Sequence, residues 1–444
     1  MTTCDVAIVG AGPAGLSAAA RLAEHGRRVV VVDEQPRPGG QYFRQHSSAV
    51  TEAAGDHRPA GARLVARAER AGVEFRLGTS VWGLADDART LLLSSGAAIE
   101  RLDAEHIVVA TGAIERAVPF AGWQLPRVVS VGYAQHLAGE GVRVGDRVLV
   151  AGSGPFLLPV ACALADLGIA VVAVLEAGHP YRPSRAGMRA LAHPARVREF
   201  AGYRARLARA RVPVRSGRWV VRAEEHGTGL RVHEARTGHP TPVAEHQVDA
   251  LCVGFGFRPQ TDLLRLLGCA TRTDEPTGDD VAIVDDRGAT SVPGVWAAGE
   301  VSGIAGAQAA LAEGEQVAQA ILGARSAASS TARRTARRTH AFAGVLAELY
   351  PAPRVLAAQA VRLLPDDATV CRCEAVPAAT IRAAARVGSD LQAVKASTRA
   401  GMGPCQGRIC APGVAALCGN SASAFTVRAP LRPVQLSAIA EAAT

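Results

Sequence analysis

The feature that most constrains this chain is a glycine-rich turn between an apolar run and an amphipathic segment near the N-terminus. The turn reads Gly10-Ala11-Gly12-Pro13-Ala14-Gly15, and Val6-Ala7-Ile8-Val9 precedes it. The first glycine permits a tight turn, the second lets the backbone approach a pyrophosphate, and the third lets the helix pack closely on the strand. N–H groups at the start of the helix attract the phosphates. The pattern therefore predicts a strand–helix–strand unit of a parallel sheet with a dinucleotide on its turn.

An acidic residue closes the next apolar run. Asp33 follows Val29-Val30-Val31-Val32 and lies 33 − 10 = 23 residues after the first glycine. A carboxylate at this position can bind the ribose hydroxyls of a dinucleotide, and Glu34 is the alternative. A glycine-rich turn that binds nothing is the structural alternative, but the position of the turn between two buried strands favours the dinucleotide.

A second, incomplete copy of this unit begins at Arg147. Gly152-Ser153-Gly154 follows an apolar strand, but Leu157 replaces the third glycine and Glu176 falls one position later than the acid of the first unit. This is the architecture of an NAD(P) site without its full fingerprint. NAD(P) binding and a purely structural role both stay open, and the missing glycine favours the structural role.

Two such units in 444 residues predict an α/β chain with two Rossmann-like domains, the second inserted into the first, and a small C-terminal helical module. Residues 101–115 and 249–261 are the expected crossing points between the two domains. Residues 324–340, rich in Ser, Ala, Thr and Arg, are typical of a linker. The predicted divisions are residues 1–122 with 249–323, 123–248, a linker and helical segment at 324–364, the cysteine-containing module at 365–420, and a tail at 421–444.

Four cysteines near the C-terminus form two close pairs. Cys371-x-Cys373 is followed, after 405 − 373 − 1 = 31 residues, by Cys405-x4-Cys410. Thiolates gain more from a soft metal than from an apolar core. Zinc prefers C-x2–4-C pairs, so the C-x-C pair favours a 2Fe-2S cluster over zinc. An amphipathic helix over residues 378–387 is expected to bring the two pairs together.

The other cysteines carry no such pattern. Cys162, Cys252 and Cys269 stand in apolar surroundings and are expected to be core residues, and Cys418 is left over. Cys4 is solitary and is expected to precede the first strand. Because the first 120 residues hold no C-x-x-C or C-x4-C, the sequence argues against a flavin-coupled disulfide reductase.

Three further motifs resemble those of the two-dinucleotide-domain flavoprotein family. They are Gly39-Gly40-Gln41, Ala110-Thr111-Gly112 and Ala297-Ala298-Gly299-Glu300. The resemblance implies FAD on the first turn, with Glu300 where the family usually has the Asp that contacts the ribityl chain. The cofactor contacts expected from the turn and the resemblance together are Gly10, Gly12, Pro13, Ala14, Gly15, Asp33, Glu34, Gly40, Gln41, Thr111, Gly112, Gly299 and Glu300.

The resemblance narrows at two longer stretches. Cys371-Arg372-Cys373-Glu374, together with residues 398–410, resembles the 2Fe-2S module related to bacterioferritin-associated ferredoxin. Residues 110–116 through Gly122-Trp123-Gln124-Leu125-Pro126 resemble the FAD-containing subunits of opine oxidases, hydrogen cyanide synthase and dye-linked proline or hydroxyproline dehydrogenases, and part of the sarcosine oxidase alpha subunit. Arg127, where a Gly often stands, and Leu157 are the departures.

This resemblance implies an alpha-type subunit that relays electrons between FAD and the cluster. A separate beta subunit with its own flavin would oxidise an amine or amino acid, and a small ferredoxin-like subunit could add another cluster. A self-contained NAD(P)H-dependent reductase is the alternative enzyme, and a metal-binding structural protein with a vestigial flavin fold is the non-enzymatic one.

Charge and hydropathy add limits. The net charge is 49 − 40 = +9, but nearly every basic residue is Arg and the only Lys is Lys395. Since no basic patch alternates with aromatic residues, nucleic-acid binding is not expected. Residues 148–165 are uncharged, yet their Gly and Pro residues indicate strand, turn and helix rather than a transmembrane span. No targeting segment is visible, so the cytoplasm is the expected location.

Overall fold

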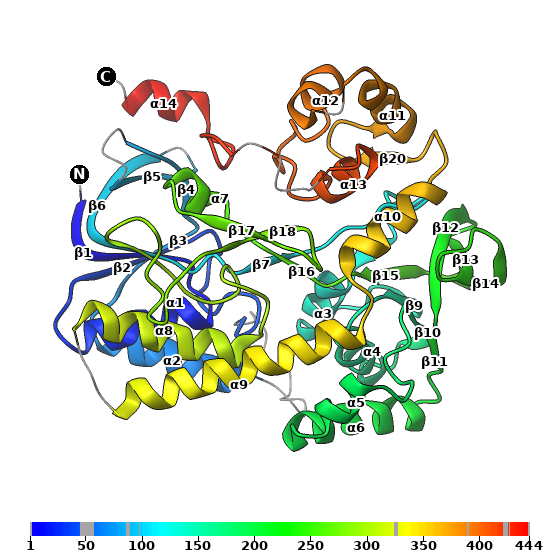
Figure 1. Ribbon diagram of the computed structural model, residues 1–444, viewed down its shortest axis with the longest axis horizontal. Coiled ribbons are helices and arrows are strands. Elements are labelled where there is room, and N and C mark those ends of the chain that lie inside the picture. The colour runs from blue at the N-terminus through cyan, green and yellow to red at the C-terminus, as the bar shows by residue number, and fades with distance from the viewer. Residues whose placement is uncertain are drawn as a thin grey trace.

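The first glycine-rich turn joins strand β1 (Thr2–Val9) to helix α1 (Pro13–Ala23), as the sequence predicts. The computed structural model describes residues 2–44, 57–85, 89–96, 98–323, 327–388, 390–420, 425 and 427–442 (Figure 1). The expectation that Cys4 precedes the first strand is wrong. Cys4 lies inside β1 with 6% of its surface exposed, because β1 already pairs with β6 from Thr2 onward.

A seven-stranded sheet of order β3-β2-β1-β6-β5-β4, with β19 paired to β6, forms the first domain. Strands β1, β2, β3, β6 and β19 are parallel to one another. Strand β5 pairs antiparallel with β6, and β4 pairs antiparallel with β5. The remaining elements are β2 (Val29–Asp33), α2 (Arg58–Arg70), β3 (Glu74–Leu77), β4 (Ser80–Leu84), β5 (Thr90–Ser95), β6 (Ala98–Val109), β19 (Val295–Ala297) and α8 (Ala307–Ile321). The return of β19 and α8 to this domain confirms that the second domain is inserted into it.

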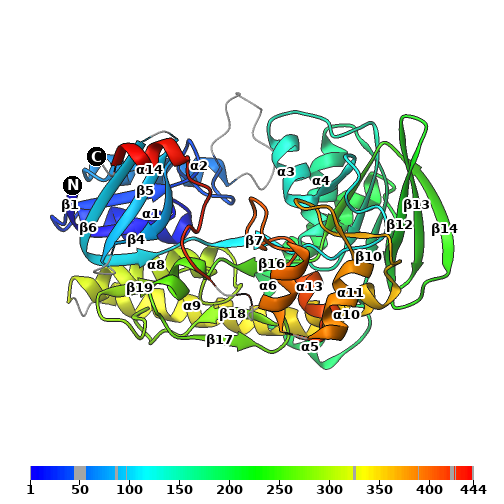
Figure 2. The same ribbon diagram turned by 90° about the horizontal axis from the view of Figure 1, so that it is seen from above.

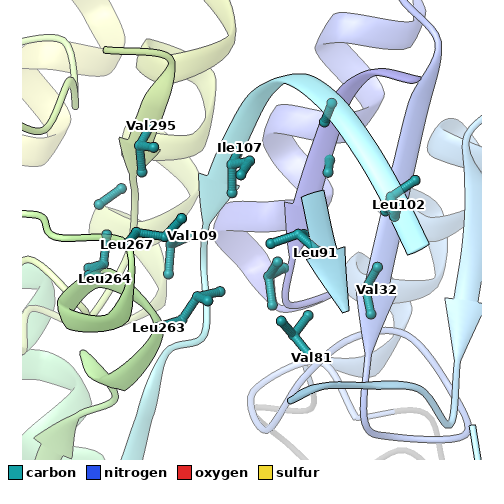
Figure 3. Packing of buried hydrophobic residues seen from close by; sticks show 14 of the residues in the cluster. Val32, Val81, Leu91, Leu102, Ile107, Val109, Leu263, Leu264, Leu267 and Val295 are labelled. Carbon is teal, nitrogen blue, oxygen red and sulfur yellow. The ribbon is translucent and has the colours of Figure 1, made fainter. Parts of the chain in front are cut away.

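Both faces of this sheet are buried. Successive side chains of a strand point to opposite faces, so Ile8 and Val31 pack among residues of α1 and α8, whereas Val32 and Val109 lie on the other side. Figure 3 shows that second face, where Leu263 of α7 (Asp262–Leu266) packs close to Val109. Burial of a side chain of this size stabilises the fold by about 1.5–3 kcal/mol. Burial on both faces explains why the strands are continuous apolar runs.

The second domain contains a five-stranded parallel sheet of order β11-β10-β9-β15-β8 and an antiparallel three-stranded sheet of order β12-β13-β14. Its elements are β8 (Val128–Ser130), α3 (Val131–Gly139), β9 (Arg147–Gly152), α4 (Leu157–Asp166), β10 (Ala170–Glu176), α5 (Arg185–Ala190), α6 (Pro194–Arg209), β11 (Val214–Ser216), β12 (Arg218–His226), β13 (Gly229–Arg236), β14 (Pro242–Val248) and β15 (Ala250–Gly254). The uncharged stretch at residues 148–165 forms β9, a turn and most of α4. Among the described residues, no helix is long and apolar enough to cross a membrane.

Two antiparallel strands, β7 (Ala113–Glu115) and β16 (Phe257–Pro259), connect the domains at the expected crossing points. A hairpin, β17 (Thr271–Asp274) and β18 (Asp279–Ala282), lies beside them. Next to β7, the guanidinium of Arg116 pairs with Asp279, and both side chains are only 2% exposed. Arg258 of β16 donates to the same carboxylate at 2.8 Å. A carboxylate shared by two guanidinium groups fixes the connection, since either partner alone would be a costly buried charge.

The expectation of a linker at residues 324–340 is wrong where the structure describes them. Helix α9 (Ala327–Leu349) is continuous over 23 residues. It contacts α8 of the first domain and α5 of the second, and Figure 1 shows it running below α8 towards the second domain. Ala and Arg are strong helix formers, so a composition that is compatible with a linker also suits a helix. The helix braces the two domains against each other.

The C-terminal module follows α10 (Pro353–Leu363) and has its own apolar core. It consists of β20 (Thr369–Cys371), β21 (Val376–Pro377), α11 (Ala378–Val387), α12 (Leu391–Thr398) and α13 (Ala411–Leu417). The helix expected at residues 378–387 is confirmed as α11. Figures 1 and 2 show the module beside the crossing strands, away from the first sheet.

The tail, part of which lies outside the described residues, returns to the first domain. Leu431 is buried there, and its N–H donates to the carbonyl of Trp82 at 2.7 Å. Helix α14 (Leu436–Ala442) contacts β6, and Figure 2 shows it over β5 and β6. The tail thus runs from the C-terminal module back to the first sheet.

Candidate cofactor sites

Motifs far apart in the sequence meet at the N-terminus of α1. Three glycines make the close approaches, as shown by the distances at which an added Cβ would meet its neighbours. That distance is 2.3 Å from the Ala110 oxygen for Gly10, 2.8 Å from the Gly12 Cα for Gly40, and 3.1 Å from the Ala14 Cβ for Gly299. The carboxyl ends of parallel strands lie at one edge of a sheet, so β1, β2, β6 and β19 deliver these motifs to one place. Gln41 follows Gly40 on the exposed side.

The space beside Gly12 fits a bound pyrophosphate. Gly12 is the N-cap of α1, and a Cβ added there would meet no atom within 4 Å. Gly15, by contrast, has the Gly10 oxygen 1.9 Å from such a Cβ, so its role is packing. Pro13 begins the helix, and no described side chain caps it. The first N–H groups of the helix are therefore left for an anion.

Asp33 closes the turn from the end of β2. Its carboxylate accepts from the backbone N–H of Ala11 at 2.6 Å and of Gln35 at 2.7 Å. Burial raises the pKa of this carboxyl, and the two N–H donors oppose that rise. Each oxygen keeps a lone pair, so Asp33 remains able to accept from ribose hydroxyls. Glu34, the alternative, is ion-paired with Arg432 of the tail.

Glu300 lies at the same edge. Burial raises the pKa of its carboxyl, and a hydrogen bond from the backbone N–H of Gly306 opposes that rise. Sequence reasoning missed Glu313 of α8, which accepts from the Gly299 N–H at 2.7 Å. His340 of α9 bonds the other Glu313 oxygen at 2.6 Å, and this bond raises the pKa of the imidazole. No sequence spacing predicts the contacts of Glu313 or Arg432, because Glu313 comes from α8 and Arg432 from the tail.

Thr111 and Gly112 face the crossing strands. The Thr111 hydroxyl donates to the Gln260 carbonyl at 2.7 Å, and the Gln260 N–H donates to the Gly112 carbonyl at 2.9 Å. Ala110, the first residue of this motif, packs against Gly10 of the glycine-rich turn. The motif therefore links the candidate flavin cradle to the connection between the domains.

The four candidate cluster ligands come together in the C-terminal module. Cys371 ends β20, Cys373 follows in the turn, and Cys405 and Cys410 precede α13. The Cys410 thiol is hydrogen-bonded to both Cys371 and Cys405, and Cys405 is also hydrogen-bonded to Cys373. In the described part of the chain, no three His, Cys, Asp or Glu side chains close around a single metal ion. A two-iron cluster spreads four thiolates over two metals and does not need that convergence.

Two of these thiols are held ready to ionise. The Cys410 thiol lowers the pKa of Cys371 to about 6, with help from the backbone N–H groups of Gly401 and Glu374. The same thiol lowers the pKa of Cys405 to about 5, with help from the N–H groups of Ile409 and Gly407. Cys410, as the shared donor, has a raised pKa. Thiolates ringed by backbone donors are the ligands that an iron–sulfur cluster requires.

The ligand loops hold a strained backbone. Among the described residues, four other than glycine have a positive φ, and Ala375, Arg399 and Gln406 of this module are three of them. A Cβ on Gly403 would lie 2.3 Å from the Cβ of Cys373. Strain of this kind gathers at ligand sites, where the surrounding structure imposes it. The loops are thus shaped for the cysteines rather than for an ordinary turn.

Arginines fasten the module to the crossing strands. Arg258 donates to the Arg408 carbonyl at 2.8 Å, and Arg408 pairs with Asp262 at 2.8 Å. On the other side, the Trp123 indole donates to the Thr369 carbonyl at 2.6 Å, and Arg372 lies 5.1 Å from the Trp123 ring. These contacts join the cysteine loops to the strands that also hold Thr111.

The second glycine-rich turn is closed by its own side chains. Glu176, 1% exposed, accepts from the Ser153 hydroxyl at 2.9 Å, from the Gly154 N–H at 2.9 Å and from the Gly178 N–H at 2.7 Å. Phe156, the N-cap of α4, packs on the Phe257 ring at 5.3 Å. The carboxylate occupies a turn N–H that would otherwise be available to a dinucleotide.

A segment from outside the domain packs next to the acid that ends β10. A Cβ on Gly178 would lie 2.4 Å from Pro351, between α9 and α10. Burial raises the pKa of the adjacent Tyr350, and the nearby Tyr181 and Glu176 raise it further. Burial likewise raises the pKa of Glu176. The chain thus packs its own inter-helix segment against the acid that ends β10.

Two protein families match the chain. Residues 4–314 match the pyridine nucleotide-disulphide oxidoreductase family, and residues 369–418 match the BFD-like [2Fe-2S] binding domain. The first match spans both glycine-rich units, and the second holds all four clustered cysteines. The chain therefore carries FAD and a 2Fe-2S cluster, as expected from the sequence.

Relatives with known names are subunits of larger enzymes. One of the subunits of opine oxidase from Rhizobium meliloti is 34% identical over 99% of both chains. The HcnB subunit of hydrogen cyanide synthase from Pseudomonas aeruginosa is 33% identical over 91% of this chain and 90% of its own. The crystal structure of L-proline dehydrogenase from P. horikoshii matches the fold with a TM-score of 0.69 and 22% identity, over 99% of this chain and 79% of its own. The resemblance of the sequence to alpha-type subunits is confirmed.

Proposed function

The chain belongs to the pyridine nucleotide-disulphide oxidoreductase family, and we propose that it is the alpha-type electron-transfer subunit of a hetero-oligomeric amine or amino-acid dehydrogenase or oxidase. Its substrates would be of the opine, proline, hydroxyproline or sarcosine kind. When bound, FAD exchanges electrons in pairs and the cluster exchanges them singly. The residues of the chain hold the two centres and connect them.

The closed second turn carries this proposal. A reductase fed by NADH or NADPH needs a turn whose N–H groups and terminal acid face the dinucleotide. Here Glu176 is only 1% exposed, unlike the half-buried Asp33, and it accepts from Ser153, Gly154 and Gly178 while Pro351 packs against the neighbouring Gly178. This arrangement argues against a nicotinamide on this chain as the electron donor and favours a partner subunit. The subunit names of the relatives support a partner, and we propose a second flavoprotein and a small ferredoxin-like subunit.

We propose the candidate cofactor contacts as well. Gly10, Gly12, Pro13, Ala14, Gly15, Gly40, Gln41, Gly299 and Glu300 would hold the pyrophosphate and flavin half, with Asp33 at the ribose and Thr111 and Gly112 at the domain connection. Cys371, Cys373, Cys405 and Cys410 would hold the cluster. The cysteines in the described part of the chain are free thiols, which suits a reducing compartment such as the cytoplasm.

Anaerobic reduction of the purified chain separates this proposal from the alternative reductase. The flavin absorbance should bleach with dithionite but by less than about a tenth as much with NADH or NADPH, because the second turn does not bind a dinucleotide. Proline, an opine or sarcosine should not bleach the isolated chain either. Rapid bleaching by NADH or NADPH would instead establish the self-contained reductase, and rapid bleaching by an amine would place substrate oxidation on this chain.

A further inference from the structure

The only lysine of the chain is buried beside the cluster loops. Lys395 lies in α12 and is 7% exposed. The sequence has 49 Lys and Arg residues, so 49 − 1 = 48 are arginines. An ammonium is compact, whereas a guanidinium is broad and planar. All the other Lys and Arg positions of the chain are Arg, so this buried position stands apart in holding a Lys.

Within the described residues Lys395 forms no ion pair with a carboxylate, and Asp262, which lines the same cavity, pairs with Arg408 instead. Its ammonium lies 5.8 Å from the centre of the Phe425 ring, and this is the contact that the structure gives it. Burial lowers the pKa of Lys395, and the positive charge of Arg428 lowers it further. A buried charge without a partner is costly, and proteins pair such charges. The counter-charge must therefore come from a group bound next to Lys395.

The cluster loops surround this lysine. A cavity of about 80 Å³ is lined by Lys395, by Gln406, Gly407 and Arg408 between two ligands, and by Ala411 directly after Cys410. The Phe425 ring, which Lys395 faces, lies 2.8 Å from where a Cβ on Gly401 would be. Gly401 and Gly407 are glycines whose N–H groups donate to the Cys371 and Cys405 sulfurs. The lysine thus shares its neighbours with the ligand thiolates.

We propose that the Lys395 ammonium is the fixed counter-charge of the 2Fe-2S cluster and keeps the cluster's reduction potential more positive than the thiolates alone would allow. Two irons and two sulfides held by four thiolates form an anionic group. One electron, from the flavin of the same chain or from dithionite, adds one negative charge and breaks no bond. A nearby cation stabilises the reduced form more than the oxidised form, which raises the potential.

The test is the midpoint potential of the cluster, followed by electron paramagnetic resonance during an anaerobic redox titration of the full chain. Lys395→Met removes the charge and keeps the length of the side chain, and Lys395→Arg keeps the charge. Arg386→Gln is the matched control, because it removes a cation from the exposed face of α11 in the same module. The flavin midpoint, measured in the same samples, should not change in any variant.

We expect Lys395→Met to shift the cluster potential to a more negative value, equivalent to about a tenfold change in how electrons divide between flavin and cluster. Lys395→Arg should keep the cluster potential close to that of the unmodified chain, and Arg386→Gln should leave the potential unchanged. An unchanged potential in Lys395→Met would overturn the proposal. Should that variant assemble no cluster, Lys395→Arg decides: a cluster with the potential of the unmodified chain supports the need for a charge, and a cluster with a clearly more negative potential overturns it.

Discussion

Replacing Gly12 with valine should give a folded chain that no longer retains FAD. The Gly12 backbone is extended, with φ −78° and ψ −173°, so a β-branched residue is not strained there. A Cβ meets no atom of the described residues within 4 Å, which means that the added side chain projects into the space left for the pyrophosphate. We expect bound flavin, measured by absorbance after protein denaturation, to fall by more than about tenfold.

Gly202→Val is the matched control for this prediction. Gly202 lies in the exposed part of α6, and a Cβ there also meets nothing within 4 Å. The control should keep its FAD, and both variants should keep the circular dichroism of the unmodified chain. A Gly12→Val protein that binds FAD in full would show that the pyrophosphate does not lie on this turn. Gly15→Val is not a substitute, because its Cβ would meet the Gly10 oxygen at 1.9 Å and disturb the fold.

Cys405→Ser should remove the cluster and leave the flavin in place. Cys405 is hydrogen-bonded to two of the other ligand thiols, and the Cys410 thiol, with help from the N–H groups of Ile409 and Gly407, lowers its pKa to about 5. A serine hydroxyl does not ionise in this range and is a poor ligand for iron. We expect the iron and acid-labile sulfide content of anaerobically purified protein to fall by more than about tenfold, with FAD unchanged.

The chain supplies a close control in Cys418→Ser. Cys418 follows α13, packs at the edge of the same core and is not among the hydrogen-bonded thiols. Its loss should leave iron, sulfide and FAD at the level of the unmodified chain. Equal loss of iron from both variants would mean that the cysteines act through the fold of the module rather than as ligands.

The local motifs of this chain could be predicted because their chemistry is local. The Gly10 turn, the acid at the end of the second strand and the α11 helix follow from residue spacing alone. The crossing strands β7 and β16 could also be placed, since apolar runs that end in glycines mark strand ends. The resemblance to a flavoprotein family supplied what spacing does not, namely which cofactor lies on the turn.

Long-range contacts could not be predicted in the same way. Residues 324–340 have a composition that suits a linker and a helix equally, and only packing of α9 against α8 and α5 decides for the helix. Glu313 reaches Gly299 because α8 folds back on α1, and Arg432 reaches Glu34 across 398 residues. The packing of Pro351 against Gly178, next to Glu176, has the same origin. Leu157 indicated an incomplete site, but not what fills it.

The measurement that bears most directly on this account is the stepwise reduction of anaerobically purified chain, with flavin absorbance and cluster paramagnetism recorded on the same sample. A single polypeptide that links the first domain to the C-terminal module through Arg258 and Arg408 should contain one FAD and one 2Fe-2S cluster, and both should exchange electrons during the titration. Protein that contains neither flavin nor iron and sulfide, or whose two centres never equilibrate, would contradict a connected electron path in this chain.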